Sequence, residues 1–355
     1  MNEIGNNLKQ IRLLKNLSLK SAGDLLNMTA TAISKYEKGE ILPDSTKLIE
    51  FANAYNVKSA DLLKVYTPPK MKFTSFRKRK RLTGQNLELL KNLIEEEVGK
   101  YLEIIEMNNI RNEIKLKKYT CNNILDAEKA AKDFRNYIGI SNKQPISDLT
   151  SILENLGIII IQIKNPMNHF DDFDGLSEMV NNTQVIVLLD GIKDGARQRF
   201  TIAHELGHLV LNITNKEIDE EKLCNRFASA LLMPEEAVKN EFGASRGNIN
   251  FFELTAFKNE FKVSYAAIIY RLKDLGIIKE HLYKKISIYL SQKIGKNDPN
   301  PIEPEKTYQF KKLVYKLEAD KIISLSKAAE LLGVTLDEYT NENNNNWHKY
   351  NNRLK

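Results

Sequence analysis

Residues 204–208 have the sequence His-Glu-Leu-Gly-His. Residues four positions apart lie on one face of a helix, so His204 and His208 can hold the same ion while Glu205 projects beside it. The motif is short, and a pair of solvated histidines is the simple alternative. However, apolar residues surround the motif, which predicts a largely buried helix, and buried His and Glu side chains need partners. We therefore expect a metal site on this helix.

A second helix is predicted after a short polar break. Asp219 is a suitable N-cap, and the helix is expected to continue to residue 232. When the two helices fold back on each other, Glu221 lies opposite His208 and Asn225 lies opposite His204. The predicted hairpin thus adds a carboxylate and an amide to the two imidazoles.

Two His and one carboxylate form the ligand set of a catalytic zinc site, in which water fills the fourth position. Zinc lowers the pKa of that water from about 16 to roughly 7, and Glu205 is placed to accept its proton as the water attacks a carbonyl. Asn225 is expected to accept the free ring N–H of His204 and to fix its tautomer. Glu220 is the competing carboxylate, but it shares a helix face with apolar residues, so we assign Glu221 as the third ligand.

The composition predicts a folded, cytoplasmic protein of two or three domains. The chain has 355 residues, of which 42% are hydrophobic, and this allows real cores. The longest apolar run, residues 157–163, is too short to span a bilayer, and the N-terminal residues lack the pattern of a signal peptide. Cys121 and Cys224 give no disulfide framework, which favours a reducing compartment. Cys224 is also a candidate metal ligand, although its position favours a small side chain in the core.

Positive charge is concentrated near the N-terminus. Residues 1–81 hold 16 Lys and Arg against 7 Asp and Glu, whereas the rest of the chain holds 37 against 39. Such an excess on a small module attracts phosphate backbones, so we expect double-stranded DNA as a partner. The run Arg-Lys-Arg-Lys-Arg at residues 77–81 is either a solvated linker or a phosphate contact.

Residues 4–65 predict an all-α module. Apolar residues recur at helical spacing from Ile4, Ser18 is the expected N-cap of a second helix, and a tight turn at residues 27–29 leads into a third helix that Gly39 ends. Two further helices follow. A helix, a short turn and a second helix form the arrangement that places side chains in the major groove of DNA.

Residues 33–39, Ile-Ser-Lys-Tyr-Glu-Lys-Gly, resemble the Cro/CI-type (XRE) helix-turn-helix family. The resemblance covers nearly the whole module and implies that Ile33 and Tyr36 pack inward. It also implies five residues that face DNA: Thr29, Ala30, Thr31, Ser34 and Lys35. Leu19 stands where the family usually has Gln, and the side chains of Ala30 and Thr31 are short, so base readout is expected to be modest and phosphate contact relatively more important. The alternative is a five-helix protein-interaction module.

The region after this module is predicted to contain one long helix and then a compact α+β domain. Residues 87–110 have the pattern of an amphipathic helix. Helices are expected at residues 127–137 and 145–156, and strands at 158–163, near 174–178 and at 184–189.

Three stretches of this domain resemble the ImmA/IrrE family of metallo-endopeptidases: residues 173–177, 197–208 and 225–234. The resemblance runs from about residue 125 to 280. It implies a zinc ion (Zn2+) held by His204, His208 and Glu221, with Glu205 as the base. Members of the family commonly cut a partner helix-turn-helix repressor in stress responses or mobile elements, so the resemblance implies such a repressor as the protein substrate.

Together these features predict a multi-domain chain. An all-α helix-turn-helix domain (1–66) is followed by a basic linker and long helix (67–120), a mainly helical α+β, zincin-like metallopeptidase domain (121–285) and a helical region with an Asn-rich tail (286–355). The expected function is a cytoplasmic, DNA-binding transcriptional regulator with zinc endopeptidase activity, and a homodimer is also expected.

Two questions stay open at the level of the sequence. The alternative function is a non-proteolytic regulator, or an antitoxin-like protein, that uses the peptidase fold as a sensor or partner-binding domain. The oxyanion formed during peptide cleavage needs a stabilising group, and the candidates are Arg197, Arg199, His169 and several Tyr.

Overall fold

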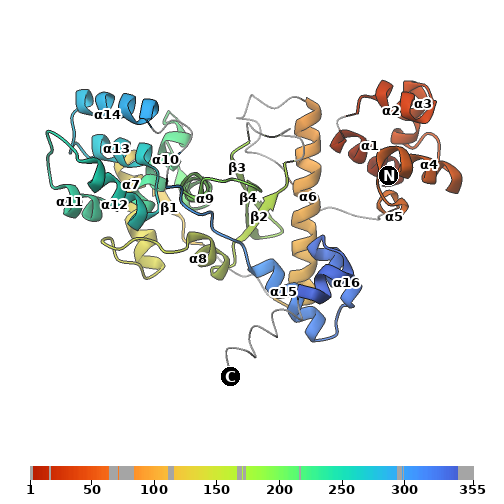
Figure 1. Cartoon of the computed structure of the whole chain (residues 1–355). Helices are drawn as coiled ribbons and strands as arrows, with labels where there is room; N and C mark the ends of the chain where they lie inside the picture. The colour runs from red at the N-terminus through yellow and green to blue at the C-terminus, as the bar shows by residue number, and fades with distance from the viewer. Residues whose placement is uncertain are drawn as a thin grey trace. The chain divides into compact units, whose positions relative to one another are not determined.

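Figure 1 shows the computed structural model of the chain. The structure describes residues 3–15, 17–63, 71, 84–110, 116–165, 170, 173–215, 217–293, 298 and 300–342. The basic run at residues 77–81, the candidate His169 and the Asn-rich tail beyond residue 342 lie outside the described residues. The chain divides into two compact units, which are Met1–Gly99 with Ile163–Phe173, and Lys100–Gln162 with Asp174–Lys355.

The N-terminal domain is helical, as predicted. Its helices are α1 (Glu3–Leu14), α2 (Leu19–Leu26), α3 (Ala30–Lys38), α4 (Ser45–Tyr55) and α5 (Ser59–Leu62). Each helix contributes to one apolar core: Leu8, Ala22, Leu26, Ile33, Phe51, Ala52, Tyr55 and Leu62. The domain is therefore held together by the inward faces that the helical spacing predicted.

Side-chain caps begin α2 and α3, and a left-handed residue ends α2. Ser18 Oγ accepts the backbone N–H of Ser21 at 3.0 Å, and Thr29 Oγ1 accepts that of Ala32 at 3.1 Å. Between them, Asn27 adopts a left-handed conformation with φ of 53°, which Asn tolerates better than most residues. These local contacts begin both helices and end the first of them.

A buried ion pair joins α1 to α3. Arg12 donates to the carboxylate of Glu37 through Nε at 2.5 Å and through Nη2 at 3.0 Å, and its Nη1 donates to the carbonyl of Leu17 at 2.6 Å. The two parallel bonds are the fork geometry that compensates both charges away from water. The pair fixes the orientation of α3 relative to α1.

The long helix that the sequence predicted is α6 (Gly84–Met107). The helices after it are α7 (Ile124–Tyr137), α8 (Leu149–Asn155), α9 (Gly195–Val210), α10 (Glu220–Leu232), α11 (Glu235–Phe242), α12 (Phe251–Phe261), α13 (Tyr265–Asp274), α14 (Glu280–Lys293), α15 (Gln309–Ala319) and α16 (Leu325–Leu332). Within the described part of the chain, no helix is both long enough and apolar enough to cross a membrane.

Two small sheets complete the second unit. A three-stranded sheet has the order β2 (Ile159–Ile163), β4 (Thr183–Leu189), β3 (Gly175–Val180), and β3 and β4 are antiparallel. Asn181 and Asn182, both with positive φ, form the two-residue turn between them, as the twist of a tight hairpin requires. The second sheet pairs β1 (Tyr119–Cys121) with β5 (Leu211–Ile213) in parallel, and neither short strand was predicted from the sequence.

Helix α9 lies at the centre of this unit. It packs on β3 and β4, while α10 packs on α9 and α7. The first turn of α9 lies against an extended segment, because Gly195 donates its N–H to the carbonyl of Ile302 at 2.8 Å. A Cβ on Gly195 would come within 2.3 Å of the carbonyl oxygen of Glu303, so only Gly fits there.

The same segment ends in a buried carboxylate that joins α8 to α9. Glu305 accepts the N–H of Leu149 at 3.0 Å and the N–H and hydroxyl of Thr150 at 2.7 and 2.8 Å, and it pairs with Arg199. The helix predicted to start at residue 145 instead starts at Leu149. That prediction was wrong because the Asp148 side chain accepts the N–H of Ser151 and caps the helix there.

Candidate metal centre

The His-Glu-Leu-Gly-His motif lies on a helical hairpin. Asp194 caps α9, and Asp219 caps α10 by accepting the N–H of Glu221 at 3.1 Å. The two helices approach closely at Gly207, where a Cβ would lie 3.2 Å from the Cα of Cys224. Because no side chain separates the helices at this point, groups on α10 can reach the imidazoles of α9.

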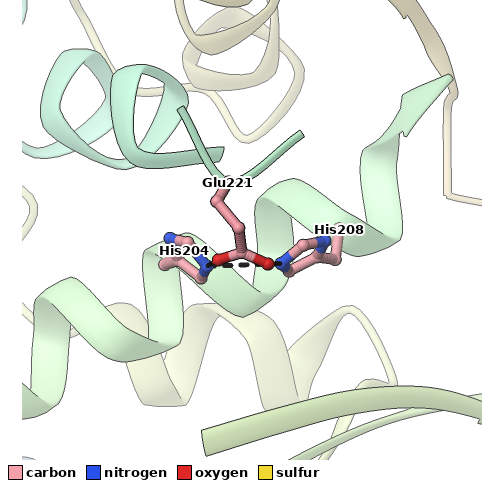
Figure 2. A group of neighbouring side chains, drawn as sticks. All are labelled: His204, His208 and Glu221. Carbon is pink, nitrogen blue, oxygen red and sulfur yellow. Dashed lines mark hydrogen bonds and ion pairs between the residues drawn. The ribbon is translucent and has the colours of Figure 1, made fainter. Parts of the chain in front are cut away.

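The structure brings together the three residues that the sequence selected as ligands. The Nε2 of His204 lies 3.1 Å from Oε2 of Glu221, and the Nε2 of His208 lies 3.4 Å from Oε1 of the same carboxylate. The two Nε2 atoms are 3.2 Å apart. Figure 2 shows both rings of α9 pointing at the carboxylate that descends from α10. One ligand atom from each of the three residues lies within 4.8 Å of the others.

The opposite nitrogen of each ring has its own oxygen partner. The Nδ1 of His204 lies 3.0 Å from Oδ1 of Asn225, and the Nδ1 of His208 lies 2.9 Å from Oε1 of Glu220. A ring whose Nδ1 carries a proton toward an oxygen presents a lone pair at Nε2. Both rings are therefore oriented with Nε2 toward the centre of the cluster.

The contact of Glu220 differs from the sequence-based interpretation. We expected Glu220 to share the core face of α10 with Cys224, but its side chain is 37% exposed and contacts His208. The first residue of a helix is not yet surrounded by the following turns, so its long side chain can leave the apolar face. Cys224 itself is fully buried, as expected.

Glu205 is the most enclosed group of the site, with only 1% of its surface exposed. Ser177 on β3 donates its hydroxyl to Oε2 of Glu205 at 2.9 Å. The sequence analysis did not identify this contact. The only available signal was that Ser177 ends the stretch 173–177, which resembles the same family as the metal-binding motif.

The cluster shifts the proton affinities of its members. Hydrogen bonds from His204 and His208 hold the pKa of Glu221 well below its usual range. Burial lowers the pKa of His208, but its interactions with Cys224 and Glu221 outweigh burial and raise that pKa to about 11. Burial also raises the pKa of Cys224, and among the described residues the ligand atoms that converge belong to His204, His208 and Glu221. A cation at the centre would take over the role of the proton on the imidazoles.

Two of the candidate oxyanion stabilisers are engaged elsewhere. Arg199 is fully buried, pairs with Glu305 and donates to the carbonyl of Ile146 at 2.8 Å. Arg197 forms an exposed ion pair with Asp174 at 2.5 Å. Arg199 therefore has a structural role in joining α8, α9 and the segment that contains Glu305.

The residues expected to face DNA lie on the outer side of α3. Thr29, Thr31 and Lys35 are exposed, and Ala30 and Ser34 are partly exposed. On the opposite side, Ile33 is fully buried and the ring of Tyr36 packs edge-on against Phe51 with centroids 5.4 Å apart. The recognition-helix face that the resemblance implied is thus available to solvent.

The fold and the site define a class of protein in which a helix-turn-helix domain and a His-Glu-x-x-His helical hairpin share one chain. The family comparisons give the same result. Residues 153–273 match a peptidase family model described as the IrrE N-terminal-like domain, and residues 8–62 match a model described as helix-turn-helix. The chain therefore carries an N-terminal XRE-type helix-turn-helix domain and an IrrE/ImmA-like peptidase domain, which confirms the fusion predicted from the sequence.

Comparison with individual proteins adds little. The chain is similar to the crystal structure of Bacillus thuringiensis PlcR in complex with the peptide PapR7 and DNA. The alignment covers 100% of this chain and 99% of that chain, at 12% identity and with a TM-score of 0.20, and a score this low carries no argument about the fold. No curated protein matched the chain.

Proposed function

We propose that the chain is a DNA-binding transcriptional regulator with zinc-dependent endopeptidase activity. The observation that carries the proposal is the convergence of His204, His208 and Glu221 beside the enclosed Glu205. This cluster lies in a domain that matches a peptidase family, and the same chain holds a helix-turn-helix domain.

The chemistry of the donor set fits zinc. Two imidazole nitrogens and one carboxylate are the ligands of many catalytic zinc sites, and such sites keep a fourth position open. The oxygen partners of both Nδ1 atoms, Asn225 and Glu220, set the ring orientation that this geometry needs. When bound, the ion would acidify water and polarise the carbonyl of a peptide.

The residues of the chain then have distinct tasks. Glu205 accepts the proton of the attacking water and returns it to the leaving amine. Its enclosure excludes bulk water, and the hydroxyl of Ser177 holds one oxygen of the carboxylate so that the other can face the reacting water. His204, His208 and Glu221 stay fixed while the proton moves.

The helix-turn-helix domain is the proposed DNA-binding part. Thr29, Ala30, Thr31, Ser34 and Lys35 would lie in the major groove, and Lys35 would contribute positive charge toward the phosphates. The proposed protein substrate is a helix-turn-helix repressor, in a stress or mobile-element circuit, as the family resemblance implies. We propose the cytoplasm as the location, because both Cys are free and buried.

We propose four regions along the chain. The helix-turn-helix domain takes residues 1–66, the linker and long helix 67–120, the peptidase domain 121–285 and the C-terminal helical region 286–355. The cap of Asn123 on α7 and the short strand β1 support the start of the peptidase domain near residue 121.

The alternative function is a regulator that uses the peptidase fold without turnover, as a sensor or a partner-binding domain. Such a regulator would not need Glu205 as a base.

The two functions are separated by Glu205→Gln, which keeps the shape of the side chain and removes its basicity. The proposed enzyme should keep its zinc while cleavage of a co-incubated partner repressor falls by a factor of about 10² or more. Glu241→Gln, an exposed residue of α11, is the matched control and should cleave normally. Unchanged cleavage in Glu205→Gln, or no cleavage by the natural chain, would favour the second function.

A further inference from the structure

The helix-turn-helix arrangement occurs a second time, near the C-terminus. The pair α2 and α3 and the pair formed by α16 and the helical residues 336–342 correspond when the numbering is shifted by 306 positions. Helices α2 and α16 both have eight residues and both begin after a Ser cap, Ser18 and Ser324. Both end at a left-handed residue, Asn27 with φ of 53° and Gly333 with φ of 66°.

The start of the second helix corresponds as well. Thr29 Oγ1 and Thr335 Oγ1 each accept the backbone N–H three residues later, at 3.1 and 3.2 Å. Ile33 and Tyr339, each four residues after its Thr, are both fully buried. The turn is closed by the same backbone hydrogen bond in both units, from Met28 to Gly23 at 2.8 Å and from Val334 to Ala329 at 3.0 Å. Residues 309–342 therefore contain a second helix-turn-helix unit.

The charges of the two units differ where DNA would be read. The helix after the first turn carries Lys35 and Lys38, both exposed, whereas residues 335–342 carry Asp337, Glu338 and Glu342, all exposed, and no Lys or Arg. Asp337 and Glu338 would repel phosphates instead of neutralising them, although Glu338 also accepts the N–H of Thr335 and Glu342 pairs with Lys311. The second unit is thus unsuited to DNA and suited to a protein surface.

The two units also differ in what covers their apolar residues. In the first unit, Leu19 and Met28 pack against the core of the domain, and α4 contacts α2. Among the labelled elements of the described chain, α16 has a substantial contact only with α15. The residues that correspond to Leu19 and Met28, which are Leu325 and Val334, are 45% and 37% exposed, and the adjacent Leu336 is 45% exposed. Within the described residues, no helix covers α16 in the way that α4 covers α2.

We propose that a second copy of this chain supplies the missing cover, so that the C-terminal units of two chains pair. The unit suits pairing with itself because it carries exposed charges of both signs, with Lys321 before α16 and Asp337 on the helix after the turn. A two-fold contact brings the same patch of both copies together, so charges of both signs within the patch can pair across it. The dimer would present two N-terminal domains, as operators with two half-sites require.

The test is the self-association of the full chain, measured by sedimentation velocity over a range of concentrations. The natural chain should form dimers. Leu325→Glu combined with Leu336→Glu should raise the dimer dissociation constant by about tenfold or more, because it places charge in the apolar contact. Leu125→Glu, at a residue of α7 that is 78% exposed, is the matched control and should leave the dissociation constant unchanged.

A second variant guards against simple misfolding of the small unit. Asp337→Lys changes an exposed side chain, and it should weaken the dimer in a way that depends on salt while the circular dichroism spectrum stays unchanged. The proposal is overturned if the natural chain is monomeric at every concentration, or if the C-terminal variants dimerise like the control. Loss of DNA binding in Leu325→Glu with Leu336→Glu, with the dimer intact, would also overturn it and identify a second DNA-reading unit. The measurement needs neither metal nor substrate, so its failure is distinct from a failure of the peptidase function.

Discussion

The pair α2 and α3 and the pair α9 and α10 are both short helical hairpins, but they hold their functional side chains in opposite ways. On α3 the residues expected to contact DNA point outward, and Lys35 is exposed. On α9 the proposed base, Glu205, is 1% exposed, and both imidazoles have oxygen partners on α10. The first site is a surface, and the second is an interior assembled from several segments.

This difference determines how each site should respond to substitution. A side chain on a solvent-exposed face acts largely alone, so its removal should change binding by a limited amount and leave the fold intact. A side chain inside a hydrogen-bonded cluster is coupled to its neighbours, so its removal should affect several groups together. The variants below test the contrast, from the largest expected effect to the smallest.

The largest effect is expected for His204→Ala and His208→Ala. Each removes one of the two proposed imidazole ligands, and the remaining donors should hold zinc too weakly to retain it through purification. Elemental analysis should find about one zinc per natural chain and almost none in either variant. Metal content equal to that of the natural chain in both variants would show that these residues are not the ligands.

A smaller loss is expected from the oxygen partners of the two rings. Asn225→Ala and Glu220→Ala leave all three ligands in place but remove the groups that orient the imidazoles, and such changes typically lower metal affinity by about 10- to 100-fold. Competition with a chelator of known affinity would measure the change. Glu217→Ala changes an exposed residue of the connection between α9 and α10 and should bind zinc normally. If all three variants bind zinc with the same affinity, Asn225 and Glu220 do not orient the imidazoles.

Substitution on the exposed face of α3 should reduce affinity by less. Lys35→Glu reverses one charge on the proposed DNA-facing side of α3 and should weaken binding of the full chain to duplex DNA by about tenfold at moderate salt, with a shallower salt dependence. Lys47→Glu makes the same charge change on α4 and should have a smaller effect. Zinc content and cleavage should be unaffected in both variants, and a parallel loss of zinc would contradict the contrast between the two sites.

The sequence predicted the parts of the fold that depend on local rules. Helical spacing and caps placed the helices of the N-terminal domain, and the four-residue spacing of His204 and His208 with the hairpin argument placed Glu221 beside them. Local rules did not predict the features that depend on contact with a distant segment of the chain. Ser177 and Glu305 reach α9 from other parts of the chain, and strands β1 and β5 exist only because they pair with each other.

The difference between Glu220 and Glu221 shows the same limit within one helix. Face assignment from periodicity treats every residue of a helix alike, and it placed Glu220 with the apolar core. The structure places its carboxylate at the Nδ1 of His208 instead. A side chain in the first turn does not have to follow the face that the periodicity assigns to it. Its direction depends on the position of the partner helix.

The smallest effect is expected for Thr29→Ala, because Thr29 lies on the exposed face and also takes part in a hydrogen bond within the fold. Thr29 is exposed and proposed to face DNA, yet its hydroxyl also accepts the N–H of Ala32 and caps α3. Loss of such a cap costs about 1 kcal/mol, so hydrogen exchange of the α3 amides should accelerate by about fivefold.

Thr29→Ser keeps the oxygen, and its α3 amides should exchange like those of the natural chain. Thr335→Ala makes the corresponding change in the C-terminal unit and should leave the exchange of α3 unchanged while that of residues 336–342 accelerates. If Thr29→Ala leaves the exchange of α3 unaltered, local caps do not set the stability of the recognition helix, and its position depends instead on buried contacts such as the pair of Arg12 and Glu37.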